Sequence, residues 1–483
     1  MNYQVISRYV GVTLLVSAFF MLLSAFVSVC FGMDSGFSGL LISAVITGIA
    51  GIFPLIFVRK SDTVTIRDGF AIIIFAWLGT CIFGSIPYVL WGDPFNPINA
   101  IFESVSGYTT TGASILEKIE SLPKSLLFWR SSTHFIGGLG VIIFMLMVLP
   151  TQSTFRFKLS RMEISSLATG DFKYNTQKVI RIITGVYFTI MIACTFSLML
   201  VGMDFYDAIN HAFSIVSTGG FSTKDASISS FNSSNIDIVA SIFMLISGLH
   251  FGLLYALFIK HQTSIFRSPV FKFFMATIIG GTLLITINLS ISHVFPTFGE
   301  SLRHAFFQMT SIGTATGLAT CDTNVWPVGS KLILIYMMIQ GACAGSTTGG
   351  IKADRAYIMI LSIKTNIKRN LHPRAIIPIR SNGVNLDNTL INNAIFYIVL
   401  YILTWFIGSV LISLTGVNLV ESISSSITCM GGVGPGFGEC GSLGNYNAFP
   451  DFAKIVLMIV MLLGRVEIFS FLMGFIIFRK KRS

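Results

Sequence analysis

The feature that most constrains this chain is a series of long apolar stretches that recurs from one end to the other. A helix of about 20 apolar residues crosses the hydrocarbon core of a bilayer. In lipid each segment must satisfy its own backbone hydrogen bonds, so the stretches predict membrane-spanning helices and an all-α polytopic membrane protein. The predicted segments are roughly 9–31, 38–58, 69–91, 124–150, 182–203, 235–259, 272–295, 328–363 (interrupted), 391–415 and 452–478.

Composition excludes a soluble domain, because only 11% of the residues are charged and the mean hydropathy is +0.78. The net charge of +11 has a topological explanation, since most Lys and Arg lie in alternate loops and in the tail. Basic loops stay in the cytoplasm, which predicts that both termini are cytoplasmic and makes nucleic acid an unnecessary partner. The basic segments are 59–67, 156–181, 260–272, 352–380 and 479–482.

The four loops predicted to face outward carry related sequences. They read N-A-I-F-E-S-V-S-G-Y-T-T-T-G-A, D-A-I-N-H-A-F-S-I-V-S-T-G-G-F, H-A-F-F-Q-M-T-S-I-G-T-A-T-G-L and E-S-I-S-S-S-I-T-C-M-G-G-V-G-P. They align on Gly112, Gly220, Gly317 and Gly434. Twelve residues before the glycine stands a small residue in every copy, and six before it stands a hydroxyl, from Ser106, Ser214, Ser311 and Thr428.

Each copy predicts a short re-entrant helix followed by an extended strand, because its apolar part is too short to span the bilayer. Four such helices would direct their partially negative C-terminal ends at one axis, and the strands would line it with carbonyls that replace the hydration shell of K⁺. The alternative is that these small residues only pack helices together. The predicted selectivity-filter residues are Thr110, Thr111, Gly112, Thr218, Gly219, Gly220, Ala315, Thr316, Gly317, Gly432, Val433 and Gly434.

The predicted organisation is therefore two N-terminal helices followed by four helix–pore loop–helix repeats around one central pore. The boundaries are 1–66 for the two helices, then 67–152, 178–268, 269–366 and 388–483 for the repeats. One pore-helix position is polar in every copy and would bond the filter strands from behind or only make packing and capping contacts. Its residues are Glu103, His211, Gln308 and Ser425.

On these four loops the chain resembles the Trk/Ktr/HKT superfamily of potassium transporters, and within it the membrane subunits of bacterial Trk uptake systems. The resemblance implies potassium as the transported and filter-bound ion, with no covalent cofactor. It also implies a homodimer in the bacterial inner membrane, regulated by a cytosolic ring of nucleotide-binding TrkA-like subunits. Sodium-preferring members have serine at the first filter glycine, whereas this chain has Gly112. A sodium- or ammonium-conducting member of the same architecture is the alternative.

The inner segment of the third repeat is interrupted by small and polar residues at 341–350. Non-helical backbone at membrane depth is tolerated where it lines a cavity or packs in protein. We expect a mobile loop that obstructs the pore, as the resemblance also implies; a small-residue packing face is the alternative. The predicted gate residues are Gly341, Gly345, Ser346, Thr347, Thr348, Gly349 and Gly350, together with Arg465.

Arg465 lies near the middle of the last apolar segment, where a cation is costly and usually functional. We expect it to face the cavity under the filter, with loop 341–350 as its partner; an ion pair with Glu467 is the alternative. The sequence has no H-E-x-x-H, G-x-S-x-G or P-loop motif, which argues against an enzyme. The basic stretch 352–380 is either a topology signal beside anionic lipids or a docking surface for the regulator.

Overall fold

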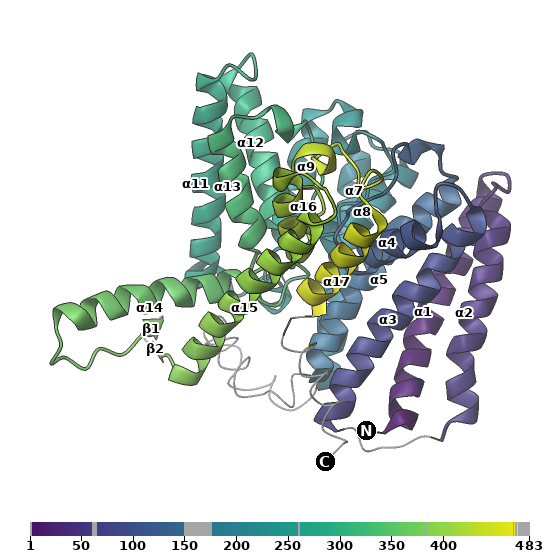
Figure 1. Cartoon of the computed structure of the whole chain (residues 1–483), viewed down its shortest axis with the longest axis horizontal. Coiled ribbons are helices and arrows are strands. Elements are labelled where there is room, and N and C mark those ends of the chain that lie inside the picture. The colour runs from purple at the N-terminus through teal and green to yellow at the C-terminus, as the bar shows by residue number, and fades with distance from the viewer. Residues whose placement is uncertain are drawn as a thin grey trace.

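The computed structural model describes residues 2–59, 65–148, 176–258, 261–381, 384–466, 468 and 471. Two N-terminal helices, α1 (Tyr3–Cys30) and α2 (Phe37–Phe57), form an antiparallel hairpin that packs along α3 and α5 (Figure 1). Six of the described helices are long and apolar enough to cross a membrane, and a bent pair would make a seventh. The prediction of an all-α membrane protein is confirmed.

Four units of helix, pore helix and helix follow the hairpin. The first contains α3 (Ile66–Trp91), α4 (Pro97–Tyr108) and α5 (Lys124–Val148), and the second α7 (Thr176–Leu200), α8 (Phe205–Ser217), α9 (Ser234–Ser247) and α10 (Phe251–Phe258). The third contains α11 (Pro269–Ile291), α12 (Phe298–Gly313), α13 (Val328–Ile339) and α14 (Ala353–Leu371), and the fourth α15 (Asn388–Ser413), α16 (Leu419–Gly431) and α17 (Asp451–Val466). Short 3-10 turns lie at Ile119–Ser121, Ser227–Phe231, Thr263–Arg267, Thr323–Val325 and Gly438–Cys440.

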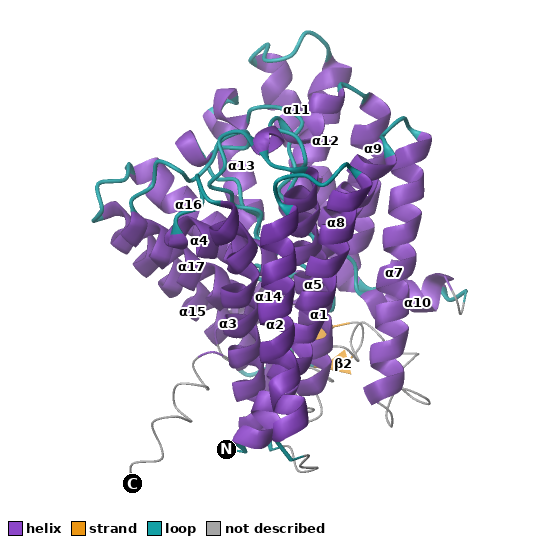
Figure 2. Cartoon of the chain, turned by 90° about the vertical axis from the view of Figure 1, so that its right-hand side faces the viewer, coloured by secondary structure: helices purple, strands orange, loops and turns teal. Residues whose placement is uncertain are grey.

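The pore helices α4, α8, α12 and α16 have 12 to 16 residues, too few to span a bilayer. Polar side chains open three of them, because Asn96, Thr297 and Asn418 each accept a backbone N–H of the first turn. Acidic residues stand in the first turn of three, as expected for a helix N-terminus. All four are buried along most of their length, so they form the core of the protein. Figure 2 shows the loops gathered among these helices.

The outer helices expose apolar side chains instead of polar ones. Phe26 of α1, Ile56 of α2 and Phe406 of α15 are each more than 60% exposed. On a soluble protein such a surface would be an aggregation hazard, whereas in a bilayer it faces hydrocarbon.

The prediction of one continuous helix over 235–259 is wrong, because α9 and α10 meet at an angle of 107°. The bend makes room for the loop that interrupts the third repeat. The freed carbonyl of Gly248 accepts the N–H of Cys343 at 3.1 Å, and the N–H of Phe251 donates to Gly345 O at 3.3 Å. A Cβ at Gly248 would lie 2.9 Å from Thr314 and 3.2 Å from Ala342, so the close approach requires glycine.

The break predicted in 328–363 is present, since α13 ends at Ile339 and α14 begins at Ala353. Helix α14 projects sideways from the bundle, beyond α11 and α13 (Figure 1). A small hairpin of β1 (Arg380–Ser381) and β2 (Val384–Asn385) follows it before α15. Most of the basic loop 156–181, the tail 479–482 and Glu467 lie outside the described residues.

Candidate ion-conducting site

The four pore loops close into a ring in chain order. A Cβ on Gly112 would collide with the carbonyl oxygen of Gly219, and one on Gly220 with that of Thr316. A Cβ on Gly317 would likewise collide with Val433 O, and one on Gly434 with Thr111 O, so the fourth loop contacts the first and closes the ring. Each glycine thus packs on the carbonyl just before the equivalent glycine of the next repeat, so a side chain at any of the four would break the ring.

The backbone of the four loops has the same unusual conformation. The residue two before the glycine is left-handed in every copy, as Thr110, Thr218, Ala315 and Gly432 have φ between 53° and 71°. The four glycines themselves have φ between 78° and 93°, whereas the residue between keeps an ordinary negative φ. This alternation of hand turns successive carbonyls toward the same side of the strand. Left-handed backbone is strained for a non-glycine residue and needs support from its surroundings.

The hydroxyl found six residues before each glycine explains part of that support. In all four loops the N–H just before the glycine donates to the backbone carbonyl of that hydroxyl residue, at 2.7 to 2.9 Å. In three loops the hydroxyl then donates to the carbonyl just after the glycine, at 2.6 to 2.8 Å. The three donors are Ser214, Ser311 and Thr428. The hydroxyl therefore ties the two sides of the turn together.

The first and fourth loops differ from this pattern. The hydroxyl of Ser106 has no hydrogen-bond partner within the described part of the chain. The hydroxyl of Tyr446 donates to the carbonyl of Gly434 at 2.7 Å, which fixes the fourth strand from behind. The four loops are therefore equivalent in backbone but not in the side chains that hold them.

The polar residue of the pore helix, nine residues before the filter glycine, forms a hydrogen bond with the strand that follows that glycine in two repeats. Glu103 accepts the N–H of Ile115 at 3.1 Å, and His211 Nε2 accepts the hydroxyl of Ser222 at 3.0 Å. Gln308 contacts the side chain of Cys321, further along its strand. Ser425 donates at 3.4 Å to Ser422 O in its own helix, a contact within α16 that does not reach the strand.

The predicted gate loop is an ordered, buried segment. Gly341 N donates to Ile351 O at 2.9 Å and Ile351 N to Ile339 O at 3.0 Å, which draws the two ends of the loop together. Gly345 and Gly350 have φ of 79° and 73°, the left-handed region that favours glycine.

This loop lies against the predicted filter. The hydroxyl of Thr347 donates to Val216 O at 3.3 Å and accepts from the Thr218 hydroxyl at 3.2 Å. On the other side, a Cβ on Gly349 would collide with the carbonyl of Gly431. The loop thus contacts the second and fourth strands where each one leaves its pore helix. For loops that enter the membrane from outside, this is the cytoplasmic end of the strand.

Arg465 contacts this loop, as expected. It is 7% exposed; its guanidinium donates to Thr347 O and, at 3.4 Å, to Gly137 O of α5. It lies in the last turn of α17, and Gly464 beside it packs on Met430 O. The third and fourth repeats are thereby joined through one buried cation.

Arg465 is not the only buried cationic side chain in the described part of the chain. Arg130, Lys352 and Lys454 are each at most 6% exposed. Lys454 donates to Asn99 at 2.9 Å, joining the fourth repeat to the first pore helix, and Lys352 donates to Thr348 O in the gate loop. Arg130 and Lys454 lie within the predicted apolar segments 124–150 and 452–478, so a scan of those segments for charge would have found them.

Within the described residues no cluster of three His, Cys, Asp or Glu could hold a metal ion. The four loops carry backbone carbonyls and, in three of them, threonine hydroxyls, oxygen groups that suit a weakly held monovalent cation.

Comparison with known proteins agrees with this geometry. Residues 40–482 match the TrkH family, described as cation transport protein. The chain is 32% identical over 475 residues to the Trk system potassium uptake protein TrkH of Halomonas elongata, covering 97% of this chain and 98% of the relative. It is 33% identical over 423 residues to the Trk system potassium uptake protein TrkG of Escherichia coli, covering 85% and 84%.

A solved structure is also similar over nearly the whole chain. The crystal structure of the potassium transporter TrkH from Vibrio parahaemolyticus superimposes with a TM-score of 0.89 and 29% sequence identity, covering 98% of both chains. The Halomonas elongata relative and this structure each cover nearly the whole chain. The chain therefore belongs to the TrkH family of cation transport proteins, and it is an integral membrane transporter, not an enzyme.

Proposed function

We propose that this protein takes up potassium through the axis enclosed by its four pore loops. The ion would be held by the carbonyls of Thr110–Gly112, Thr218–Gly220, Ala315–Gly317 and Gly432–Gly434. The observation that carries the proposal is the cyclic packing of Gly112, Gly220, Gly317 and Gly434. A carbonyl ring replaces the hydration shell of K⁺ only if all four strands keep their place, and the names of the relatives support potassium as the ion.

The loop 341–350 is proposed as the gate of this pore. It lies against two of the four strands and is held there by Thr347, Gly349 and the buried Arg465. An ion passing the filter would meet the loop and the guanidinium together. Conduction therefore requires that the loop move and that Arg465 lose or change its contact with Thr347 O.

The regulatory and cellular setting is proposed from the family resemblance. A TrkA-like subunit with nucleotide-binding domains would act from the cytosol on the basic stretch 352–380, which includes the projecting helix α14. The protein would work as a homodimer in the bacterial inner membrane, with both termini in the cytoplasm and anionic lipids beside its basic loops.

The direct test is uptake of K⁺, Na⁺ and NH₄⁺ into proteoliposomes containing the purified protein. We expect K⁺ uptake to exceed that of the other two ions at equal gradients. A preference for Na⁺ or NH₄⁺ would refute potassium uptake and support the alternative of a sodium- or ammonium-conducting member. Because the loop 341–350 lies against two of the four strands, the assay includes a variant with residues 344–347 deleted. Absence of flux in that variant as well would refute the pore.

A further inference from the structure

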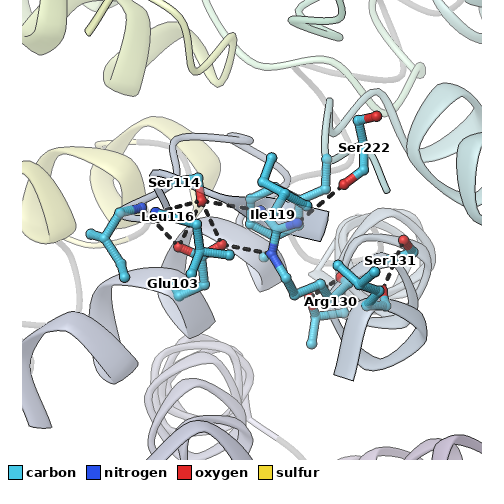
Figure 3. A network of polar contacts seen from close by, with 12 residues as sticks. Glu103, Ser114, Leu116, Ile119, Arg130, Ser131 and Ser222 are labelled. Carbon is cyan, nitrogen blue, oxygen red and sulfur yellow. Dashed lines mark hydrogen bonds and ion pairs between the residues drawn. The ribbon is translucent and has the colours of Figure 1, made fainter. Parts of the chain in front are cut away.

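Glu103 and Arg130 form an ion pair in the interior of the protein, directly behind the first pore loop. Arg130 Nε lies 2.7 Å from Glu103 Oε1, and the two side chains are 1% and 0% exposed (Figure 3). Glu103 comes from the pore helix α4 and Arg130 from the following helix α5. Burying two charges is unfavourable unless their remaining hydrogen-bonding groups are also satisfied, so the other contacts of the pair indicate its role.

Those other contacts lead to the pore loops. The Ser114 hydroxyl donates to Glu103 at 3.0 Å, and Arg130 Nη2 lies 3.2 Å from the same hydroxyl. The Ile115 N–H donates to Glu103 at 3.1 Å, and Arg130 Nη1 donates to the carbonyl of Ser222 at 3.2 Å. Ser114 stands two residues after Gly112, and Ser222 stands two after Gly220. The pair thus clamps equivalent points of two neighbouring loops.

The same face of α5 also holds the residue just after the second filter glycine. The Arg130 guanidinium lies 3.9 Å from the ring centroid of Phe221, and the His134 ring stacks on Phe221 at 4.1 Å. His134 Nε2 accepts the Phe221 N–H at 3.1 Å, so its Nδ1 carries the proton and donates to Gly107 O at 2.7 Å. The strand of the second repeat is therefore positioned by side chains of the first.

The Glu103–Arg130 pair lies in the repeat that lacks the hydroxyl bond across the turn. In repeats two to four the hydroxyl six before the glycine bonds the carbonyl just after it, but among the described residues the Ser106 hydroxyl has no partner. In repeats two to four, the residues that occupy the position of Glu103 are His211, Gln308 and Ser425, which carry no acidic group. The first repeat thus uses an ion pair where the others use a hydroxyl.

We propose that Glu103 and Arg130 are positioning residues that set the geometry of the first two filter strands and thereby the preference among cations. The inference rests on the proposed function, since it assumes that these strands form the filter. The pair contacts the strands two residues beyond the glycines, so it acts through the backbone without touching the ion. The planar guanidinium bonds Glu103, Ser114 and Ser222 at once, which the single ammonium of lysine cannot reproduce.

The test compares K⁺ and Na⁺ uptake by proteoliposomes containing the wild type, Arg130→Lys or Glu103→Gln. Both substitutions keep much of the side-chain volume and remove one part of the network. We expect the K⁺/Na⁺ uptake ratio of each variant to fall by about tenfold, the effect of losing one charge-assisted hydrogen bond. Arg303→Lys is the matched control. Arg303 pairs with Asp237, with Nε and Oδ2 3.6 Å apart, and its other side-chain hydrogen bonds are to Ser234 and His304.

Ser114→Ala keeps the experiment decisive if the charge variants do not fold. It removes the hydroxyl shared by both partners, leaves both charges in place, and is expected to lower the ratio to a smaller extent. Unchanged ratios in folded, monodisperse Arg130→Lys or Ser114→Ala protein would overturn the inference, while a potassium-selective wild type would leave the proposed function standing. A wild type without potassium preference would instead refute the proposed function.

Discussion

At the scale of single residues, the site depends on hydroxyls that bridge a turn and on glycines that allow carbonyls to approach. Ser311 shows the first, because its hydroxyl donates to Leu318 O at 2.7 Å across the third loop. Gly137 shows the second, because a Cβ there would collide with Tyr108 O. The repeat pattern revealed the hydroxyl positions, which recur six residues before each filter glycine, but it gave no indication of Gly137, which lies outside the four loops.

The hydroxyl bridge gives a prediction with a built-in control. Ser311→Ala removes a buried bond to Leu318 O and is expected to lower the free energy of unfolding by about 1 kcal/mol. Ser106→Ala, at the equivalent position of the first loop, is expected to change it far less, because within the described chain that hydroxyl has no partner. Thermal unfolding of both purified variants in detergent measures the difference. Equal destabilisation would show that the bond makes no particular contribution.

A second prediction concerns Asp34, in the turn between α1 and α2. Partial burial acts to raise the pKa of Asp34, but hydrogen bonds from Ser125, Ser28 and Gly36 outweigh it and hold the pKa below its ordinary value. Because the pKa is lowered on folding, the carboxylate stabilises the protein above the ordinary value, and this contribution is lost as the pH falls through the lowered one.

Asp34→Asn should therefore unfold at a lower temperature than the wild type at pH 7, with a loss of about 1 kcal/mol. The difference should persist down to pH 5 and shrink only in stronger acid. Thermal unfolding in detergent across this range measures it. A difference that already disappears between pH 7 and pH 5 would contradict the assigned direction.

Charged residues at membrane depth were the least predictable of the side chains. Arg465 was identified because it stands near the middle of a long apolar segment, and its contact with the 341–350 loop is present. The Glu103–Arg130 pair could not be recognised, because its partners lie 27 residues apart and their meeting depends on the angle between α4 and α5. Spacing along one helix predicts contacts within that helix, not contacts between two helices.

At the scale of elements, the long helices were predictable because apolar length alone defines a membrane span. The break after Ile339 was predictable from the run of small and polar residues that follows. The sharp bend between α9 and α10 was not predicted from apolar length; there Gly248 and Phe251 form backbone hydrogen bonds with the 341–350 loop of another repeat. The local signal was the pair Ser247-Gly248, which is typical of helix kinks but does not interrupt the apolar stretch.

The gate loop gives a prediction at this scale. Arg465→Ala removes the donor that holds Thr347 O and is expected to raise the basal K⁺ leak several-fold. The matched control is Arg8→Ala, whose guanidinium likewise bonds backbone carbonyls, those of Leu55 and Val58, but in the N-terminal hairpin. Uptake into proteoliposomes without any regulatory subunit measures the leak. A leak that stays at the wild-type level in Arg465→Ala would show that this residue does not hold the gate.

At the scale of the whole molecule, the four copies occupy equivalent places although only the aligned glycine is common to all the filter strands. The ring order follows the chain order, because each glycine contacts the carbonyl of the next repeat and the fourth contacts the first. The sequence predicted fourfold equivalence from matched spacing. It could not predict that different side chains hold the loops. An ion pair contacts the first loop, hydroxyl bonds bridge the second to fourth, and a tyrosine also binds the fourth.

The most direct test of the central claim is the K⁺/Na⁺ uptake ratio of Gly112→Ser, compared with the wild type and with Gly202→Ser. Both glycines have a positive φ, but a Cβ on Gly202 meets no atom within 4 Å, whereas one on Gly112 collides with Gly219 O. We expect Gly112→Ser to lose most of the potassium preference and Gly202→Ser to keep it. A folded Gly112→Ser protein with the wild-type ratio would contradict the four-strand filter.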